Sequence, residues 1–125
     1  MPEVHGYHAH VYYSDDTLPV AQKLRTALES QFPVEIGRFS GAEVGPHPVP
    51  QFQVIFKNDI FATVVPWLML NRDGLDILVH PLTDDMVDDH TDFAMWLGSP
   101  IELKIHTLQR RGYSAALLPS APATA

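Results

Sequence analysis

The chain has 125 residues, of which 46% are hydrophobic and 18% charged, a balance typical of folded globular proteins. Fifteen Asp and Glu against eight Lys and Arg leave a net charge of -7, which argues against nucleic acid as a partner because phosphate backbones attract basic surfaces. The absence of Cys excludes disulfides and thiolate metal sites, and seven His leave imidazole as the reactive, metal-binding group.

The length predicts one domain over residues 1–114, followed by an Ala/Pro-rich tail over 115–125. The N-terminus lacks the basic and apolar segments of a secretory signal, and no stretch reaches the ~20 apolar residues of a membrane span. We therefore expect a cytoplasmic protein that does not associate with membranes.

Hydrophobic periodicity predicts the secondary structure in chain order. The expected elements are a strand over 7–13, a helix from the turn at 14–17 to about 32, strands over 34–39 and 51–56, a helix from 57 to about 70, a strand over 75–80, a helix over 83–97 and an edge strand over 101–107. Pro66 should kink or break the second helix. The order β-α-β-β-α-β, with an additional C-terminal helix and edge strand, predicts an α+β ferredoxin-like fold.

Alternation within the predicted strands sorts their side chains onto two faces. In the first strand, Ala9 and Val11 lie on one face, and His8, His10 and Tyr12 lie on the other. The other strands add further polar residues to the second face, namely Gln51, Gln53, Asp76 and His80. A sheet face rich in His and Gln indicates a site or a dimer contact.

Three motifs supply candidate metal ligands. His8 and His10 are two apart on a strand, so both rings can reach one ion, although a hydrogen-bonded surface pair gives the same pattern. His47 lies between two prolines, which fits a rigidly held ligand and equally a tight turn. His80 ends a strand before a proline, on the face predicted for the first pair.

The remaining candidates are weaker. His90 follows an acidic run that fits a helix N-terminus, and it could serve as an acid–base group. An iron site of two histidines and one carboxylate could draw on Asp76, Glu43 or Asp89. Glu102 and His106 would share one face of the last strand, and His5 has no assigned role.

The spaced motifs together resemble the DOPA 4,5-dioxygenase family of small extradiol-type ring-cleavage enzymes. The matching stretches are YHAHVYY at 7–13, GPHP at 45–48, FQV at 52–54, PWLMLNR at 66–72, LVHP at 78–81, DHT at 89–91 and WLG at 96–98. This resemblance implies a ferredoxin-like fold and the opening of a catechol-type ring, on DOPA or a simpler catechol, with molecular oxygen and Fe(II). Zinc or nickel could replace the iron in a crystal.

The resemblance also suggests roles for individual residues. His10, His47 and His80 are expected to bind the metal, His8 to act as a fourth ligand or a substrate base, and His90 to transfer protons. The assignment of side chains to faces, rather than the resemblance, suggests that Tyr12, Gln53 and Trp67 shape the ring pocket. Arg72 either holds a substrate carboxylate or forms a surface salt bridge.

Two other functions fit the same sequence. The chain could be a non-enzymatic metal- or ligand-binding ferredoxin-like dimer, or a structural domain whose open sheet face pairs with a second copy. A homodimer is the expected assembly and is compatible with all three hypotheses.

Overall fold

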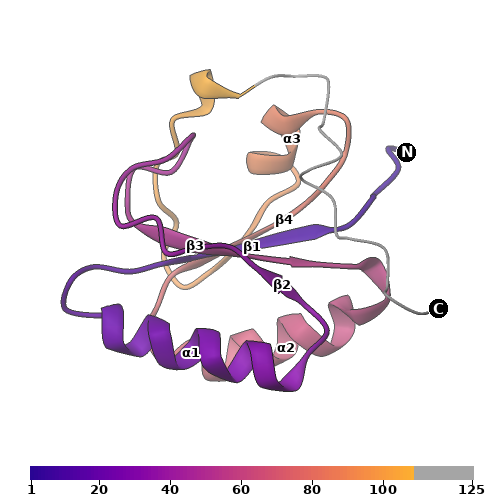
Figure 1. Ribbon diagram of the computed structural model, residues 1–125. Helices are drawn as coiled ribbons and strands as arrows, with labels where there is room; N and C mark the ends of the chain where they lie inside the picture. The colour runs from indigo at the N-terminus through magenta and orange to yellow at the C-terminus, as the bar shows by residue number, and fades with distance from the viewer. Residues whose placement is uncertain (109–125) are drawn as a thin grey trace.

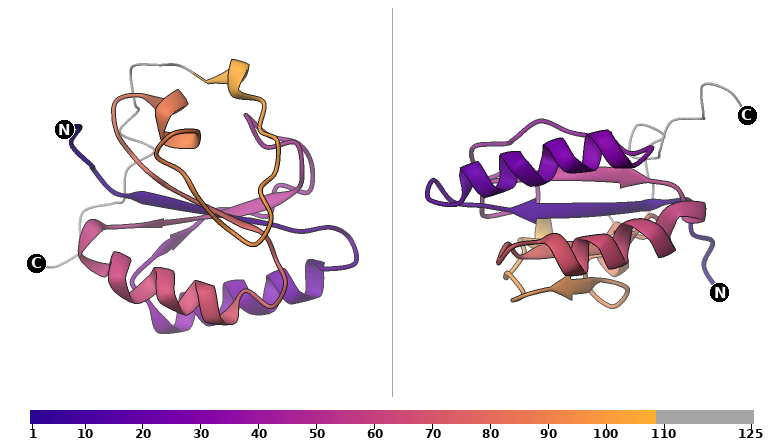
Figure 2. Two further views of the ribbon diagram at one scale, coloured as in Figure 1. Left: turned by 180° about the vertical axis from the view of Figure 1, so that it is seen from behind. Right: turned by 90° about the horizontal axis from the view of Figure 1, so that it is seen from below.

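The computed structural model describes residues 1–108 and places two helices on one face of a five-stranded antiparallel sheet (Figure 1). The elements are β1 (Tyr7–Tyr12), α1 (Leu18–Gln31), β2 (Glu35–Ile36), β3 (Gln51–Phe56), η1 (Asn58–Ile60), α2 (Phe61–Asn71), β4 (Ile77–Pro81), α3 (Met86–His90), β5 (Met95–Leu97) and η2 (Ile105–Thr107). The helices α1 and α2 lie side by side beneath the sheet, whereas α3 and the loops lie above it (Figures 1 and 2).

The sheet order β2-β3-β1-β4-β5 confirms the ferredoxin-like arrangement. β1 lies at its centre and pairs antiparallel with both β3 and β4. This order follows from two crossovers, each of which carries its helix across the same face of the sheet. The central strand is consequently covered on both sides, by helices below and by loops above.

The alternation of the strands separates core from pocket, as predicted. Ala9, Val11, Phe52 and Val54 are fully buried beneath the sheet, where α1 and α2 pack on them. His8 and His10 occupy the intervening positions of β1 and therefore project from the opposite face. Burial of large side chains such as Phe52 contributes about 1.5–3 kcal/mol each and holds the histidine-bearing strands in register.

The second helix continues through Pro66, so the predicted break is wrong. Pro66 cannot donate to the carbonyl of Ala62, the residue four positions earlier. Both residues are exposed, and water can satisfy that carbonyl instead. The helix is unbroken over Phe61–Asn71 and buries Val64, Val65 and Leu68.

The chain after β4 differs from the prediction. The helix expected over 83–97 is only Met86–His90, capped by the Asp85 carboxylate that accepts from the Asp88 N–H. It is followed by β5, which pairs with β4 and occupies the sheet edge. Residues 101–107 therefore form no strand, and Glu102 and His106 share no strand face. The tail expected over 115–125 and the domain boundary at 114 lie outside the described residues.

None of the helices within residues 1–108 combines the length and the apolar character that crossing a membrane requires.

Candidate metal centre

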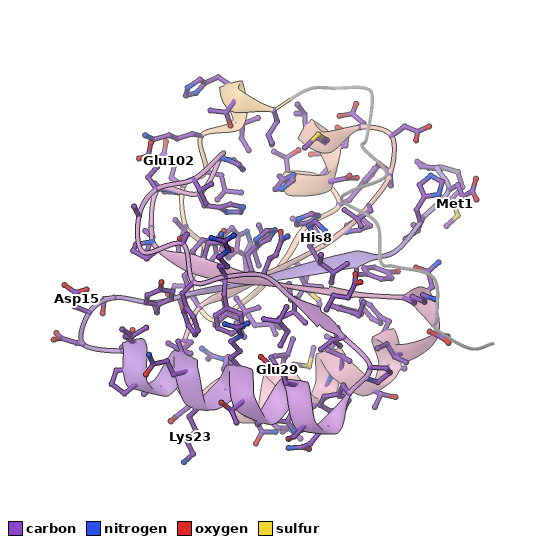
Figure 3. All side chains as sticks on the ribbon, viewed as in Figure 1. Met1, His8, Asp15, Lys23, Glu29 and Glu102 are labelled. Atoms are coloured by element: carbon purple, nitrogen blue, oxygen red, sulfur yellow. The ribbon has the colours of Figure 1, made fainter. Side chains whose placement is uncertain are left out.

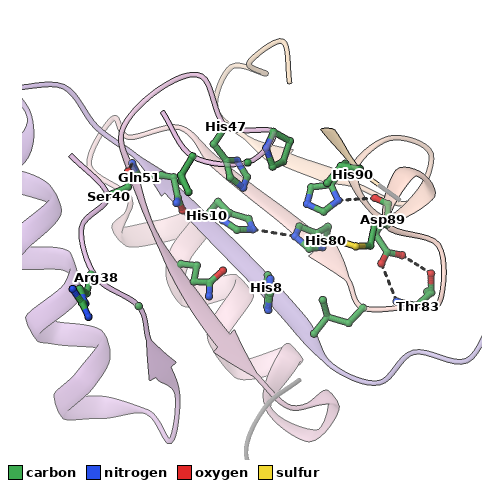
Figure 4. A pocket seen from close by; sticks show the side chains of 18 residues that line it. His8, His10, Arg38, Ser40, His47, Gln51, His80, Thr83, Asp89 and His90 are labelled. Atoms are coloured by element: carbon green, nitrogen blue, oxygen red, sulfur yellow. Dashed lines mark hydrogen bonds between the residues drawn. The ribbon is translucent and has the colours of Figure 1, made fainter. Parts of the chain in front are cut away.

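Five buried histidines converge at one site (Figure 4). Figure 3 shows one of them, His8, above the sheet, on the side away from α1 and α2. The histidines line a cavity of about 450 Å³, which lies within the size range of small-molecule sites. The five are His8, His10, His47, His80 and His90. The remaining wall is largely apolar and comes from the loop after β2, the 44–47 loop, the segment after β4 and α3.

Different elements bring these histidines together. His8 and His10 belong to β1, and the register pairs His8 with His80 on the neighbouring β4. His47 lies in a loop closed by a backbone bridge to Val44. His90 is the last residue of the short helix α3. Strand pairing thus fixes three of the rings, and one ring from a loop and one from α3 complete the cluster from above.

Three of the rings have one nitrogen tied to an oxygen acceptor. His10 Nδ1 lies 2.9 Å from Gln51 Oε1, His80 Nδ1 lies 2.9 Å from the Pro81 carbonyl and His90 Nδ1 lies 2.7 Å from the Met86 carbonyl. A carbonyl oxygen only accepts, so Nδ1 of each ring carries the proton and donates. In the neutral rings the Nε2 lone pairs are then free for the cavity, as in histidines that bind metals.

The Nε2 atoms of His10 and His80 face each other at 3.0 Å (Figure 4). If both rings keep their Nδ1 bonds and are neutral, two lone pairs point at each other. A proton between them would require one ring to be cationic. However, burial and, secondarily, the neighbouring imidazoles hold the pKa of both rings well below the ordinary value. A metal cation satisfies both lone pairs without that penalty.

The spacing fits such an ion. Two nitrogens that are 3.0 Å apart, each about 2.1 Å from one metal, subtend about 90° at the ion. Two sets of three histidines each have ligand atoms within 4.8 Å of one another, namely His8 with His10 and His80, and His10 with His47 and His90. The cluster could therefore hold a metal ion, with His10 in both sets. The expected ligands His47 and His80 fall in different sets.

His47 has an acid–base environment of its own. Its Nδ1 lies 2.7 Å from the Tyr12 hydroxyl. Burial, with smaller contributions from His90 and His8, lowers the pKa of His47 to about 4. Burial also raises the pKa of Tyr12, so its hydroxyl stays protonated. A neutral hydroxyl both donates and accepts, so it allows His47 to carry its proton on either nitrogen.

One carboxylate reaches the cavity wall, that of Asp89, which is 2% exposed. Its oxygens accept from the Thr83 N–H at 3.0 Å and the Thr83 hydroxyl at 2.5 Å. Burial raises the pKa of Asp89, and the Thr83 hydrogen bonds oppose that shift. The other candidate carboxylates lie elsewhere: Glu43 pairs with Lys104 at the surface, and Asp76 accepts from the Ser99 N–H.

Two of the four expected substrate-contacting residues lie at the site. Gln53 lines the cavity, and Tyr12 adjoins it through His47. Trp67 instead packs against Phe32 on the helical face, with ring centroids 5.4 Å apart. Arg72 follows α2 and donates to the Leu75 carbonyl. Neither Trp67 nor Arg72 is among the residues that line the histidine cavity, so the roles expected for them there do not fit their positions.

Sequence reasoning gave no role to four polar residues of the cavity, Arg38, Ser40, Gln51 and Thr83. Gln51 was placed on the correct face but given no role, although it holds His10. Arg38 lines the cavity from the segment after β2, because the strand expected over 34–39 forms only at Glu35–Ile36. The alternation that identified Gln53 also identifies Gln51, whereas Arg38 carried no such signal.

Residues 7–107 match the Dopa 4,5-dioxygenase family, and the chain belongs to that family. It is 32% identical over 118 residues to the DOPA 4,5-dioxygenase of Amanita muscaria, covering 85% of this chain and 50% of that protein. It is 35% identical over 117 residues to an uncharacterized 21.2 kDa protein of Botryotinia fuckeliana, covering 84% and 64% of the two chains. The chain thus spans between half and two thirds of the length of these curated relatives.

A solved structure has the same fold. It is described as the crystal structure of a "putative dioxygenase" from Nostoc punctiforme, with a TM-score of 0.82 and 47% identity, covering 83% of this chain and 90% of that one. The matching family and this structural neighbour are both named for dioxygenases.

Proposed function

We propose that the protein is a metal-dependent, extradiol-type dioxygenase that opens a catechol-type aromatic ring. The observation that carries this proposal is the pair of Nε2 atoms of His10 and His80, 3.0 Å apart. Both Nδ1 atoms of this pair already donate to oxygen. A cation is the partner that satisfies these two buried lone pairs, and family membership supports the use of that cation in oxygen chemistry.

We propose His8, His10 and His80 as the ligands, because their nitrogens lie within 4.8 Å of one another. His8 here takes the place that the sequence suggested for His47, which falls in the other set of three histidines. Imidazole nitrogens suit iron(II), and also zinc or nickel. Bound here, iron(II) would supply the electron exchange that allows dioxygen to react with an aromatic ring.

His47 and His90 then act on protons. Their pKa values are lowered, to about 4 for His47, and burial is the main cause in both. They are therefore neutral at pH 7 and able to accept the hydroxyl protons of a catechol. Tyr12 keeps its own proton and orients the His47 ring through the bond between its hydroxyl and His47 Nδ1. The other ring nitrogen of His47 can then take up a substrate proton and return it during ring opening.

The cavity wall would hold the ring itself. Val44, Pro46, Leu82 and Met86 form apolar walls around the histidines, which favours a flat aromatic substrate and excludes water from it. Gln53 adds a neutral hydrogen-bonding group from β3. This wall replaces the one that Trp67 was expected to supply.

The direct test combines metal analysis with oxygen uptake. The purified chain is loaded anaerobically with iron(II), and oxygen consumption is measured with DOPA, 4-methylcatechol and other simple catechols. We expect one equivalent of metal and ring-opened, coloured products. The variants His10→Ala and His80→Ala should lose both metal and turnover, whereas the control His5→Ala should retain them, because His5 lies outside the cavity.

Three results separate the alternatives. Metal binding without oxygen uptake on any catechol would favour the non-enzymatic metal-binding module. Full metal content and activity in both His10→Ala and His80→Ala would refute the proposed site. A His8→Ala variant that keeps its metal while His47→Ala loses it would restore His47 as the third ligand. Sedimentation analysis of the same samples tests the expected homodimer.

A further inference from the structure

The cavity wall contains one permanent cation. Arg38 is the single Lys or Arg among the lining residues within 1–108, in a chain whose net charge is -7. Its side chain is exposed, and no ion pair joins it to a carboxylate of the described residues. Figure 4 shows Arg38 set apart from the histidines, toward one end of the site.

The backbone at Arg38 is fixed although its side chain is exposed. The Gly37 N–H donates to the Gln53 carbonyl and the Ser40 N–H donates to the Gln51 carbonyl, both at 2.9 Å. These two bonds continue the pairing of β2 with β3 on either side of Arg38. The backbone of Arg38 is thereby held beside β3, the strand that carries Gln51 and Gln53, which fixes where its side chain begins relative to the histidines.

No matching anion is available at the cavity. Asp89 is the single carboxylate among the described lining residues, and both of its oxygens already accept from Thr83. Glu43 is engaged by Lys104. A substrate ammonium group would therefore find no unengaged carboxylate there, whereas a substrate carboxylate would meet a guanidinium with five donors.

We infer that Arg38 is a specificity-determining residue that selects catechols carrying a carboxylate and no amine, such as dihydroxyphenyl alkanoates. The inference rests on the proposed function for the binding of the ring. The histidines hold the ring end, and Arg38 receives the carboxylate at the other end of the cavity. The selection works against the chain's negative charge, which would otherwise favour cationic ligands.

The test measures equilibrium binding, so that it does not depend on turnover. The purified 125-residue chain is kept anaerobic and titrated calorimetrically with 3-(3,4-dihydroxyphenyl)propionate, 4-methylcatechol and dopamine. The propionate should bind about five- to tenfold more tightly than 4-methylcatechol, the range of one charged hydrogen-bonded contact at a partly exposed site. Dopamine should bind no more tightly than 4-methylcatechol.

Charge variants identify the residue responsible. Arg38→Gln should make the propionate and 4-methylcatechol bind equally well, and Arg38→Glu should make dopamine the best of the three ligands. The matched control Lys23→Gln removes the same charge from α1, outside this cavity, and should leave the order unchanged. Circular dichroism of each variant verifies the fold.

Several results would overturn the inference. The inference fails if Arg38→Gln still binds the propionate more tightly than 4-methylcatechol, or if Lys23→Gln loses that preference to the same extent. It also fails if the wild type binds dopamine most tightly. Absence of binding by all three ligands also overturns it. Oxygen uptake with 4-methylcatechol, which has no carboxylate, then decides separately whether the proposed dioxygenase function fails as well.

Discussion

Acidification of the metal-free protein should unfold it at a mildly acidic pH, because its histidine cluster resists protonation. His10, His47, His80 and His90 all have pKa values below the ordinary 6.5, with burial as the main cause. In the unfolded chain the same rings titrate near pH 6.5. Below that pH the unfolded state binds more protons than the folded state, so stability falls as the pH falls.

The magnitude follows from the size of the shifts. Each ring that stays neutral in the folded state lowers the free energy of unfolding by about 1.4 kcal/mol for every pH unit below the pKa of that ring in the unfolded chain. For His47, a pKa lowered from 6.5 to about 4 amounts to about 3 kcal/mol once the pH reaches 4. His10, His80 and His90 lower the stability in the same direction, because burial lowers the pKa of each ring. The loss from His47 alone is already a large share of a typical folding free energy of about 5–15 kcal/mol.

Urea unfolding monitored by circular dichroism between pH 7.5 and 4.5, with chelator present, measures this loss. Asp89 acts in the opposite direction, because its raised pKa makes the folded state bind a proton first, but it is one group against four. The control His106→Asn changes a surface histidine outside the cavity and should leave the slope unchanged. A free energy of unfolding that is constant from pH 7.5 to 5 would refute the argument.

Three further predictions concern single side chains. Gln51→Leu removes the acceptor of His10 Nδ1 and should weaken metal binding about 10- to 100-fold in a chelator competition, with little change in stability. Leu28→Ala empties a fully buried position under the sheet and should lower the urea-unfolding free energy by about 2–5 kcal/mol; a loss below 1 kcal/mol would contradict the packing. Gly98→Ala places a Cβ 2.5 Å from Asp76 Oδ1 at a φ of +90°, so its melting temperature should fall further than that of Gly41→Ala, which has φ +66° and open space around it; an equal fall would show that the backbone angle alone matters.

The sequence predicted the histidine face well because strands have an exact period of two. Once the strand containing His8 and His10 was placed, its apolar neighbours Ala9 and Val11 fixed which face met the helices. The same arithmetic placed His80 beside them, and the register of β1 with β4 confirms it. Assigning each side chain to a face of the sheet required only the period of two, and no knowledge of which strands are neighbours.

The predictions failed where no period could be resolved or where the period was not applied. A helix of five residues and a strand of three residues, α3 and β5, are too short to show one. Trp67 follows Val64 by three positions on α2, so helical spacing directs it toward the core side of that helix, away from the pocket. Arg38 reaches the cavity from residues that were expected to continue a strand over 34–39, whereas that strand ends at Ile36.

Metal binding and acid stability depend on the same atoms, and the variant His80→Leu separates them. Leu removes a buried ring that resists protonation and supplies apolar volume, so the metal-free variant should lose its stability at a lower pH than the wild type. It also removes the Nε2 that faces His10, so the variant should bind no metal. In the wild type, a saturating metal binds only the folded state and should itself extend stability to lower pH. An acid transition unmoved in His80→Leu, or one unmoved by metal in the wild type, would mean that the imidazole cluster does not set the stability of this protein.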